Sequence, residues 1–413
     1  MSPFATLAVL LSGAAVLLVG NGLFGTLIGV RATIESFSPA TTGMIMSAYF
    51  TGYVAGSFLC VKAIAQVGHI RTLAALSAIL AATAMAHAIF IHPVVWGAFR
   101  MVAGLCVVGF FLVTESWLNS IAPPGMRGRV FSIYMTVNLL AVASGQYLLA
   151  LADPGEFVLF GVVSILFALS LVPTALAQID APPPQRPQGL NLRALYHASP
   201  VGVVGCLTCG ILTGSFWGMA PVFGNKIGLS QVGIAGFMST VIIGGMLAQW
   251  PIGTLSDRID RRKVIVFTAA MGCIAAGLAA FLAKISTTGL LAAAALFGAA
   301  LFPSYSLAVA RTHDVIGGER VLETTRGLIL LFGVGAIVGP LISGWVMASF
   351  DPRSIFVLFA GLFAAFAAFG LYRLPRGETI AAEDQTAFVP LVRTSQEGVE
   401  FAEEPNLPKD PEK

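Results

Sequence analysis

Two ionisable residues, Arg100 and Glu115, stand in one long apolar stretch of the chain. An arginine stays charged at physiological pH and can hold a carboxylate through a planar pair of hydrogen bonds. A glutamate can gain and lose a proton, as coupling to a proton gradient requires. The two are roughly 22 Å apart along a helix at ~1.5 Å per residue, which is too far for them to pair directly. Their directions around the helix differ by about 60°, so both can face one cavity.

Each of the two residues has a structural alternative. Arg100 either binds a substrate carboxylate or influences a nearby acid, or it extends to the outer lipid interface with its charged end in water. Glu115 either carries a coupling proton or pairs with Arg127, Arg129 or another base of the neighbouring loops. The sequence leaves both roles open for each residue.

Further polar and aromatic residues interrupt the apolar stretches at positions where they could line a site. In a helix bundle such residues commonly bond to a neighbouring helix, so both roles again remain open. These candidates for substrate binding or coupling are Asn21, Tyr49, Tyr53, Tyr134, Asn138, Trp217, Gln249 and Tyr305.

The composition identifies the solvent around these residues. The 413 residues are 57% apolar and only 10% charged, and the mean hydropathy is +0.87. A soluble domain carries about 25% charged residues, so most of this surface must face lipid. Soluble enzymes, disulfide-stabilised secreted proteins and disordered chains are thereby excluded. The five cysteines lie in apolar runs and are interpreted as packing residues.

The chain divides into twelve apolar stretches. A helix needs roughly 20 apolar residues to cross the membrane, and such long runs satisfy their own backbone as helices. We therefore predict an all-α, polytopic membrane protein with spans at about 4–30, 40–66, 71–91, 94–119, 128–151, 156–178, 198–222, 230–254, 263–284, 288–311, 321–348 and 354–373.

Lys and Arg are concentrated in alternate connections, which the positive-inside rule assigns to the cytoplasm. The poorer set of connections holds only Arg31, Lys226, Lys284 and Arg353. With an even number of spans, we expect a multi-pass protein of the cell membrane, the inner membrane in a bacterium, with both termini cytoplasmic. Arg311, His313, Asp314 and Arg326, before the eleventh span, are interpreted as a charge network between helices.

Four regions result from these spans. Residues 1–179 form an N-terminal six-helix bundle, 180–197 a proline-rich cytoplasmic linker with a short surface helix after the prolines, and 198–374 a C-terminal six-helix bundle. Residues 375–413 are acidic and lack an apolar period, so we expect a disordered cytoplasmic tail. Without the last 38 residues the net charge is +8.

The two halves resemble each other. Gly145 in the fifth span corresponds to Gly339 in the eleventh, 194 positions later, and Asp153-Pro154 is echoed by Asp351-Pro352. Duplicated halves favour alternating access, in which two bundles rock about a site at their interface.

An ordered motif, G-x-L-x-D-R-x-x-R-R, occupies the connection between the eighth and ninth spans, from Gly253 to Arg262. A glycine lets helices approach closely, and an aspartate can pair with arginine at a helix end. The motif resembles the signature loop of the major facilitator superfamily, in its second-half copy. The resemblance implies a conformational latch that holds the outward-open state, formed by Gly253, Asp257, Arg258, Arg261 and Arg262.

Other strings agree with this resemblance, which covers the membrane body but not the tail. Arg100-Met-Val-Ala-Gly104 resembles the superfamily's R-x-x-x-G motif, associated with proton coupling or substrate contact. The strings at 47–52, 99–104, 115–116 and 245–253 resemble the YcaD-like group of bacterial facilitators. Two positions depart from the superfamily pattern: Ala65 replaces the aspartate of the first-half latch, and Gln146 replaces the proline of an antiporter motif in the fifth span.

We therefore expect a secondary active transporter, not an enzyme, that moves a small organic molecule. We expect this molecule to be an anion and its transport to be coupled to a proton. Multidrug or metabolite efflux by proton antiport is the alternative; a non-transporting membrane sensor or scaffold is a more distant one. No phosphate-binding loop of the G-x-x-x-x-G-K-[ST] type occurs in the sequence. We expect no cofactor, no metal and no nucleic acid, and a monomer in contact with membrane lipid.

Overall fold

The computed structural model describes residues 3–123, 126–176, 192–316, 321–376, 380–386 and 388–391. This part of the chain is almost entirely helical and contains no strand. Within it, twelve helical segments are long and apolar enough to cross a membrane, so the predicted spans are confirmed. They are α1 (Pro3–Ile34), α2 (Pro39–Val67), α3 (His69–Ile89), α4 (Pro93–Ile121), α5 (Arg127–Tyr147) with η1 (Leu148–Leu151), α6 (Val158–Leu169) with α7 (Leu171–Leu176), α9 (Pro200–Lys226), α10 (Gln231–Ser256), α11 (Arg261–Leu282), α12 (Thr287–Ile316), α13 (Val321–Ser349) and α14 (Ser354–Arg373).

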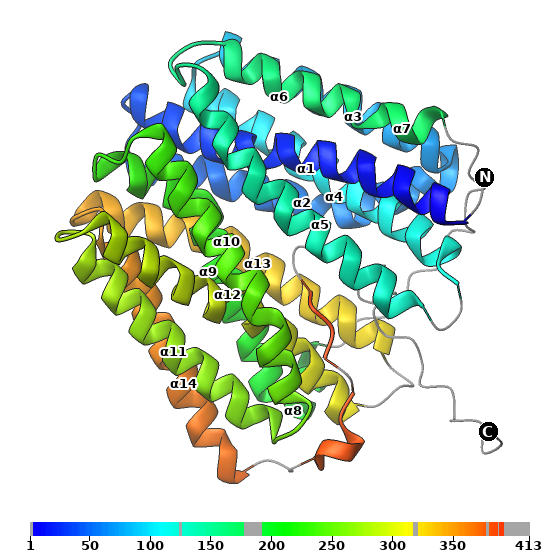
Figure 1. Cartoon of the computed structure of the whole chain (residues 1–413), viewed down its shortest axis with the longest axis vertical. Coiled ribbons are helices and arrows are strands. Elements are labelled where there is room, and N and C mark those ends of the chain that lie inside the picture. Colours follow the sequence, from blue (N-terminus) through cyan, green and yellow to red (C-terminus); the bar gives the residue numbers. More distant parts are fainter. Residues whose placement is uncertain are drawn as a thin grey trace.

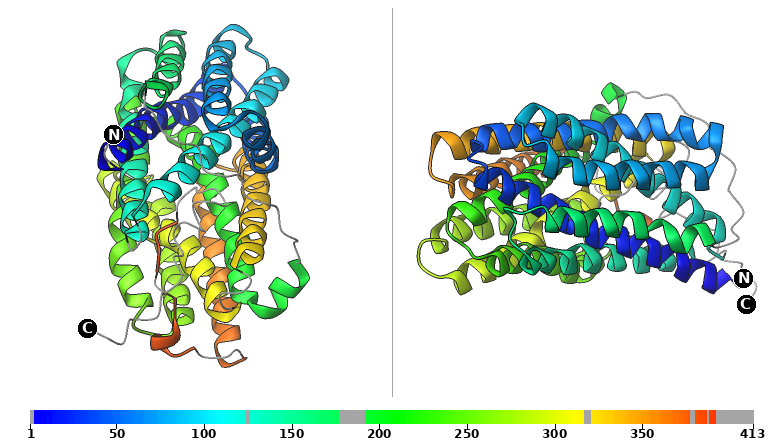
Figure 2. Two further views of the ribbon diagram at one scale, coloured as in Figure 1. Left: turned by 90° about the vertical axis from the view of Figure 1, so that its right-hand side faces the viewer. Right: turned by 90° about the horizontal axis from the view of Figure 1, so that it is seen from above.

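The spans form two six-helix bundles, α1 to α7 and α9 to α14, as the sequence predicts (Figures 1 and 2). The start of α1 and the end of α14 lie at one end of the bundles, which we call the terminal side. The other end, with the connections 35–38 and 227–230, is the opposite side. The bundles are close at the opposite side and diverge toward the terminal side (Figure 1).

Local signals set the helix ends. The Ser38 and Ser230 side chains accept hydrogen bonds from Thr41 and Gly233, at 3.1 Å in each case, and so cap α2 and α10. Asp260 caps α11 in the same way. Gly68 separates α2 from α3 with φ of 87°, a conformation that favours glycine.

Glycines at helix crossings show that the two halves are built alike. In the first half, Gly52 and Gly104 let α2 and α4 touch, because a Cβ at either would clash with the backbone of the other helix. In the second half, Gly244 and Gly298 do the same for α10 and α12. The crossings α1/α5 and α9/α13 repeat the arrangement at Gly145 and Gly339. The predicted correspondence at 194 positions therefore reflects equivalent helix contacts.

Contacts between the bundles close the opposite side. Ser47 of α2 donates a hydrogen bond of 2.6 Å to the Ile337 carbonyl of α13, and Ser239 of α10 donates one of 2.8 Å to the Ala143 carbonyl of α5. Gly43 lies so near α13 that a Cβ there would clash with that helix's backbone. Each serine lies about two turns from the end of its helix at the opposite side. The two bundles are therefore in contact over this half of their interface.

The predicted linker and tail lie partly outside the described residues, which omit 177–191 and 392–413. The short surface helix expected after the prolines is α8 (Leu192–Ala198). For the tail, the expectation of a disordered segment from residue 375 is wrong over residues 380–386 and 388–391. These residues, which we call the strap, pack against the C-terminal bundle and include a short helix, η4 (Ala382–Asp384). Leu391 is only 4% exposed.

Candidate functional site

Four of the predicted site residues meet around one cavity between the bundles. Asn21 of α1, Tyr49 of α2 and Arg100 of α4 come from the first half, and Trp217 of α9 comes from the second. All except Trp217 are less than 9% exposed. The structure thus brings together residues from four spans. The sequence identified each of them as a candidate but did not show that they lie around one cavity.

Arg100 lies inside the protein and not at a lipid interface, since it is 4% exposed. Its guanidinium carbon is 4.3 Å from the centre of the Tyr49 ring and 5.2 Å from that of Phe24. Such cation–π contacts stabilise a desolvated charge by about 2 kcal/mol. The glycine crossing at Gly52 and Gly104 sets α4 against α2 and so fixes the position of the arginine. The arrangement places a permanent positive charge beside a cavity, where it can bind an anion.

A second, mostly apolar cavity adjoins the first and shares Tyr49 and Phe50 with it. It is lined from both bundles, by α2, α4, α9, α12 and α13. The predicted residues Tyr53 and Tyr305 lie on its wall, and the Tyr305 ring packs against Phe332 with 4.7 Å between centroids. The first cavity presents the charged Arg100, and the second presents a mostly apolar, aromatic wall that also includes Arg326 of α13.

Glu115 lies elsewhere on α4, about four turns from Arg100. It is fully buried, and the Tyr134 hydroxyl of α5 donates a hydrogen bond of 3.1 Å to its carboxylate. Asn138, also buried, comes one turn after Tyr134 on α5. The structure therefore joins Glu115 to one predicted residue of α5, Tyr134, but it does not place Glu115, Tyr134 or Asn138 on the Arg100 cavity.

Gln249 of α10 lies at a third cavity, of about 440 Å³. Its walls are α5 of the first half and α10 of the second, together with Phe388 and Pro390 of the strap. Gln249 is thus separate from the Arg100 group and faces the space between the bundles nearer the terminal side.

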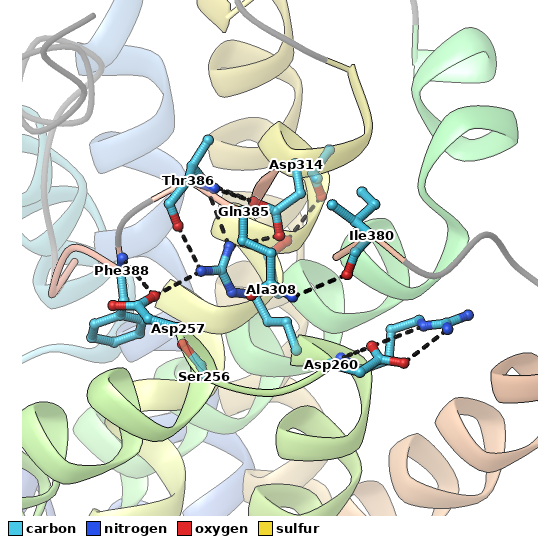
Figure 3. A network of polar contacts seen from close by, with 12 residues as sticks. Ser256, Asp257, Asp260, Ala308, Asp314, Ile380, Gln385, Thr386 and Phe388 are labelled. Atoms are coloured by element: carbon cyan, nitrogen blue, oxygen red, sulfur yellow. Dashed lines mark hydrogen bonds and ion pairs between the residues drawn. The ribbon is translucent and has the colours of Figure 1, made fainter. Parts of the chain in front are cut away.

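Among the predicted latch residues, Arg261 is buried and has two acidic partners, Asp257 and Asp314, which are labelled in Figure 3. Its guanidinium pairs with Asp257 at 2.9 Å and with Asp314 of α12 at 2.6 Å. It also donates a hydrogen bond of 2.7 Å to the Thr386 carbonyl of the strap. Arg258 is exposed. Asp314 belongs to the charge network expected from the sequence, whereas the strap contact was not predicted.

Beside Arg261, Asp260 and Arg262 form a second pair. The Asp260 carboxylate accepts from the Arg262 amide at 3.0 Å and pairs with the Arg262 guanidinium at 2.8 Å. Partial burial acts to raise the pKa of Asp260, but the hydrogen bonds and the charge of Arg262 outweigh it, so the pKa lies below its ordinary value. Asp260 is therefore charged at neutral pH and holds the start of α11.

Sequence reasoning missed a buried polar contact next to the Arg100 cavity. Thr26 of α1, which lines that cavity, donates a hydrogen bond of 2.5 Å to the Gln146 side chain of α5. The Gln146 amide in turn donates to the Gly22 carbonyl at 3.0 Å. The signal was present, because Gln146 is the residue that replaces a motif proline in the fifth span. The Gln146 side chain therefore links α5 to α1 by hydrogen bonds.

Known proteins match this chain along most of its length. Residues 10–321 and 232–397 match the family model described as Major Facilitator Superfamily. An uncharacterised MFS-type transporter of Enterobacter sp. strain 638 is 28% identical over 86% of this chain and 92% of its own length. The uncharacterised MFS-type transporter YcaD of Shigella flexneri is 28% identical over the same shares.

Solved structures share the fold. The crystal structure of the nucleoside transporter NupG has a TM-score of 0.71 at 16% identity, covering 91% of this chain and 100% of NupG. A bacterial homologue of the human lysosomal transporter Spinster, inward-facing and occupied, has a TM-score of 0.73 at 13% identity, covering 92% and 97%. At such identities the likeness concerns the fold alone.

Proposed function

Because this chain belongs to the major facilitator superfamily, as a YcaD-type member, we propose that it carries a small organic molecule across the membrane by alternating access, with the substrate bound at the Arg100 cavity. The single observation that carries this site is the buried guanidinium of Arg100 at a cavity lined from both bundles. Rocking of the bundles would expose such a cavity to one side and then the other.

The chemistry of the two adjoining cavities suggests the substrate class. Arg100 would hold an anionic group, because a guanidinium binds a carboxylate or phosphate through two parallel hydrogen bonds. The apolar cavity with Tyr53 and Tyr305 would take an apolar or aromatic body. We therefore propose an organic anion with an apolar part as the substrate.

Glu115 is the candidate for coupling transport to a proton. A carboxyl removed from water favours its protonated form, and a change of conformation that admits water would release the proton. The Tyr134 hydroxyl, 3.1 Å from the carboxylate, would stabilise its charged form. This pair supports proton-coupled transport, either inward with the substrate or outward in exchange for it.

For the orientation, we propose that the terminal side faces the cytoplasm of a bacterial cell. The connections at the terminal side carry most of the Lys and Arg, while those at the opposite side hold only four. In intact cells, a membrane-impermeant maleimide is expected to label Arg353→Cys at the opposite side but not Arg129→Cys at the terminal side. Arg129 is exposed in the folded protein, and Arg353 is partly exposed, with 26% of its side-chain surface accessible. Labelling of Arg129→Cys in intact cells, with Arg353→Cys protected, would reverse the orientation.

The function is tested with purified protein and a panel of organic anions. A ligand that binds only the folded state raises the unfolding temperature, and at 100 times its Kd it adds about 2.7 kcal/mol of stability. We expect a hit among anions with an apolar part, followed by counterflow of the same compound in proteoliposomes. Growth-inhibition tests on a strain that overexpresses the protein distinguish an importer from the alternative, an efflux antiporter. Binding without any counterflow would contradict transport.

A further inference from the structure

The strap lies where the two bundles diverge, and its backbone is bonded to the latch. The Thr386 amide donates to the Asp314 carboxylate at 2.8 Å, and the Phe388 amide donates to the Asp257 carboxylate at 3.0 Å. In return, Arg261 donates to the Thr386 carbonyl at 2.7 Å. Figure 3 shows Thr386 beside Asp314 and Phe388 beside Asp257. The strap thus bonds to the same three charged groups that hold the latch together.

Farther along, the strap reaches into the protein. The Leu391 amide donates to the Ser306 hydroxyl of α12 at 2.9 Å, and the Leu391 side chain is buried. Ser306 is roughly 15 Å from the terminal end of α12 at ~1.5 Å per residue. It is next in sequence to Tyr305, which lines the apolar cavity between the bundles. The strap therefore extends toward the proposed substrate site.

Phe388 occupies a surface that α10 could otherwise use for helix packing. Its ring covers Gly253, where an added Cβ would clash with the ring. With Pro390, the ring forms part of the wall of the 440 Å³ cavity between α10 and α5. Since α5 and α10 already touch near the opposite side, closing the terminal side would bring their remaining halves together. Phe388 and Pro390 stand in that space.

We propose that the strap is an autoinhibitory wedge: it holds the terminal side open by standing between α5 and α10 and by bonding to the latch. The terminal side can close only after the strap has left Asp257, Arg261 and Gly253. Binding of the strap therefore favours the open form, and its release permits the other half of the cycle. This inference rests on the proposed alternating access.

The test measures the distance between the terminal ends of the bundles by pulsed electron paramagnetic resonance. Spin labels are attached at Arg129→Cys and Lys263→Cys, which are exposed and lie in different bundles. Cys273 is replaced by Ala, because the other four native cysteines are buried. The readout needs no knowledge of the substrate.

Two truncations form a matched pair. A chain ending at Arg376 lacks the strap, whereas a chain ending at Leu391 keeps it and lacks only residues 392–413. We expect the strapless chain to show a roughly tenfold rise in the ratio of closed to open populations, as the loss of a few net hydrogen bonds would give. The chain ending at Leu391 is expected to behave like the full chain. In the full-length chain, Phe388→Ala is expected to shift the ratio in the same direction by less.

The outcomes separate the two proposals. If the full chain changes its distance distribution with pH or with a ligand found in the binding screen, but neither the strapless chain nor Phe388→Ala differs from it, the wedge is contradicted and alternating access stands. If every chain keeps one distance under all conditions, both are contradicted. Should the strapless chain not fold, Phe388→Ala in the full chain decides: an unchanged ratio contradicts the wedge.

Discussion

Replacing Glu115 with Gln is expected to abolish pH-driven accumulation of the substrate in proteoliposomes while leaving counterflow close to the level of the unsubstituted protein. Gln keeps the shape of the side chain but cannot carry a proton. If one proton moves with each substrate, a gradient of one pH unit supports about tenfold accumulation. Without the proton, the substrate should only equilibrate. The measurement is uptake of labelled substrate with and without a pH gradient.

Two further variants serve as comparisons for Glu115→Gln. Glu156→Gln changes an exposed acid at the opposite side and should leave accumulation intact. Tyr134→Phe removes the hydroxyl that donates to Glu115 at 3.1 Å. Because Glu115 keeps its carboxyl group in this variant, coupling should survive. Accumulation by Glu115→Gln equal to that of the unsubstituted protein would show that the proton travels elsewhere.

Replacing Arg100 with Gln is expected to weaken binding of an anionic substrate roughly 100-fold, because two charge-assisted hydrogen bonds are lost. Arg100→Lys keeps the charge but not the planar group that lies over the Tyr49 ring. We expect it to lose roughly tenfold. The measurement is the Kd from a thermal-shift titration, with counterflow as a second readout.

The unfolding temperature of the ligand-free protein distinguishes a role of Arg100 in binding from a role in folding. Arg353→Gln removes a partly exposed arginine at the opposite side, which pairs with Asp351, and should leave the Kd unchanged. If Arg100 served only packing, Arg100→Gln would lower the unfolding temperature of the ligand-free protein without changing the Kd. A preference for uncharged ligands in both the unsubstituted protein and the variant would contradict the anion site.

The two predicted effects concern different ends of one helix. Arg100 and Glu115 are about four turns apart on α4, which α2 holds rigidly at the Gly52 and Gly104 crossing. A helix packed in this way moves as a unit with its bundle. We infer that substrate binding and proton release would be linked through the rocking of the first bundle and not by direct contact.

The sequence by itself determined the membrane body of this protein. Twenty-residue apolar runs must form helices in lipid because their backbone has no other partner, so the spans and the two bundles could be predicted locally. The correspondence of Gly145 with Gly339 was readable because helix crossings in both halves demand a residue without a Cβ. The latch motif was readable because its charges occur in a fixed order.

The partners across helices were decided only by the tertiary structure. Polar residues such as Tyr134 and Asn21 suit either an interhelical bond or a cavity wall, and only packing assigned Tyr134 to Glu115 and Asn21 to the Arg100 cavity. The strap was misjudged for a further reason. Its acidic composition indicates solvation, but it is held largely by backbone amides and a carbonyl. Almost every residue carries these groups, so composition cannot reveal which segment will use them.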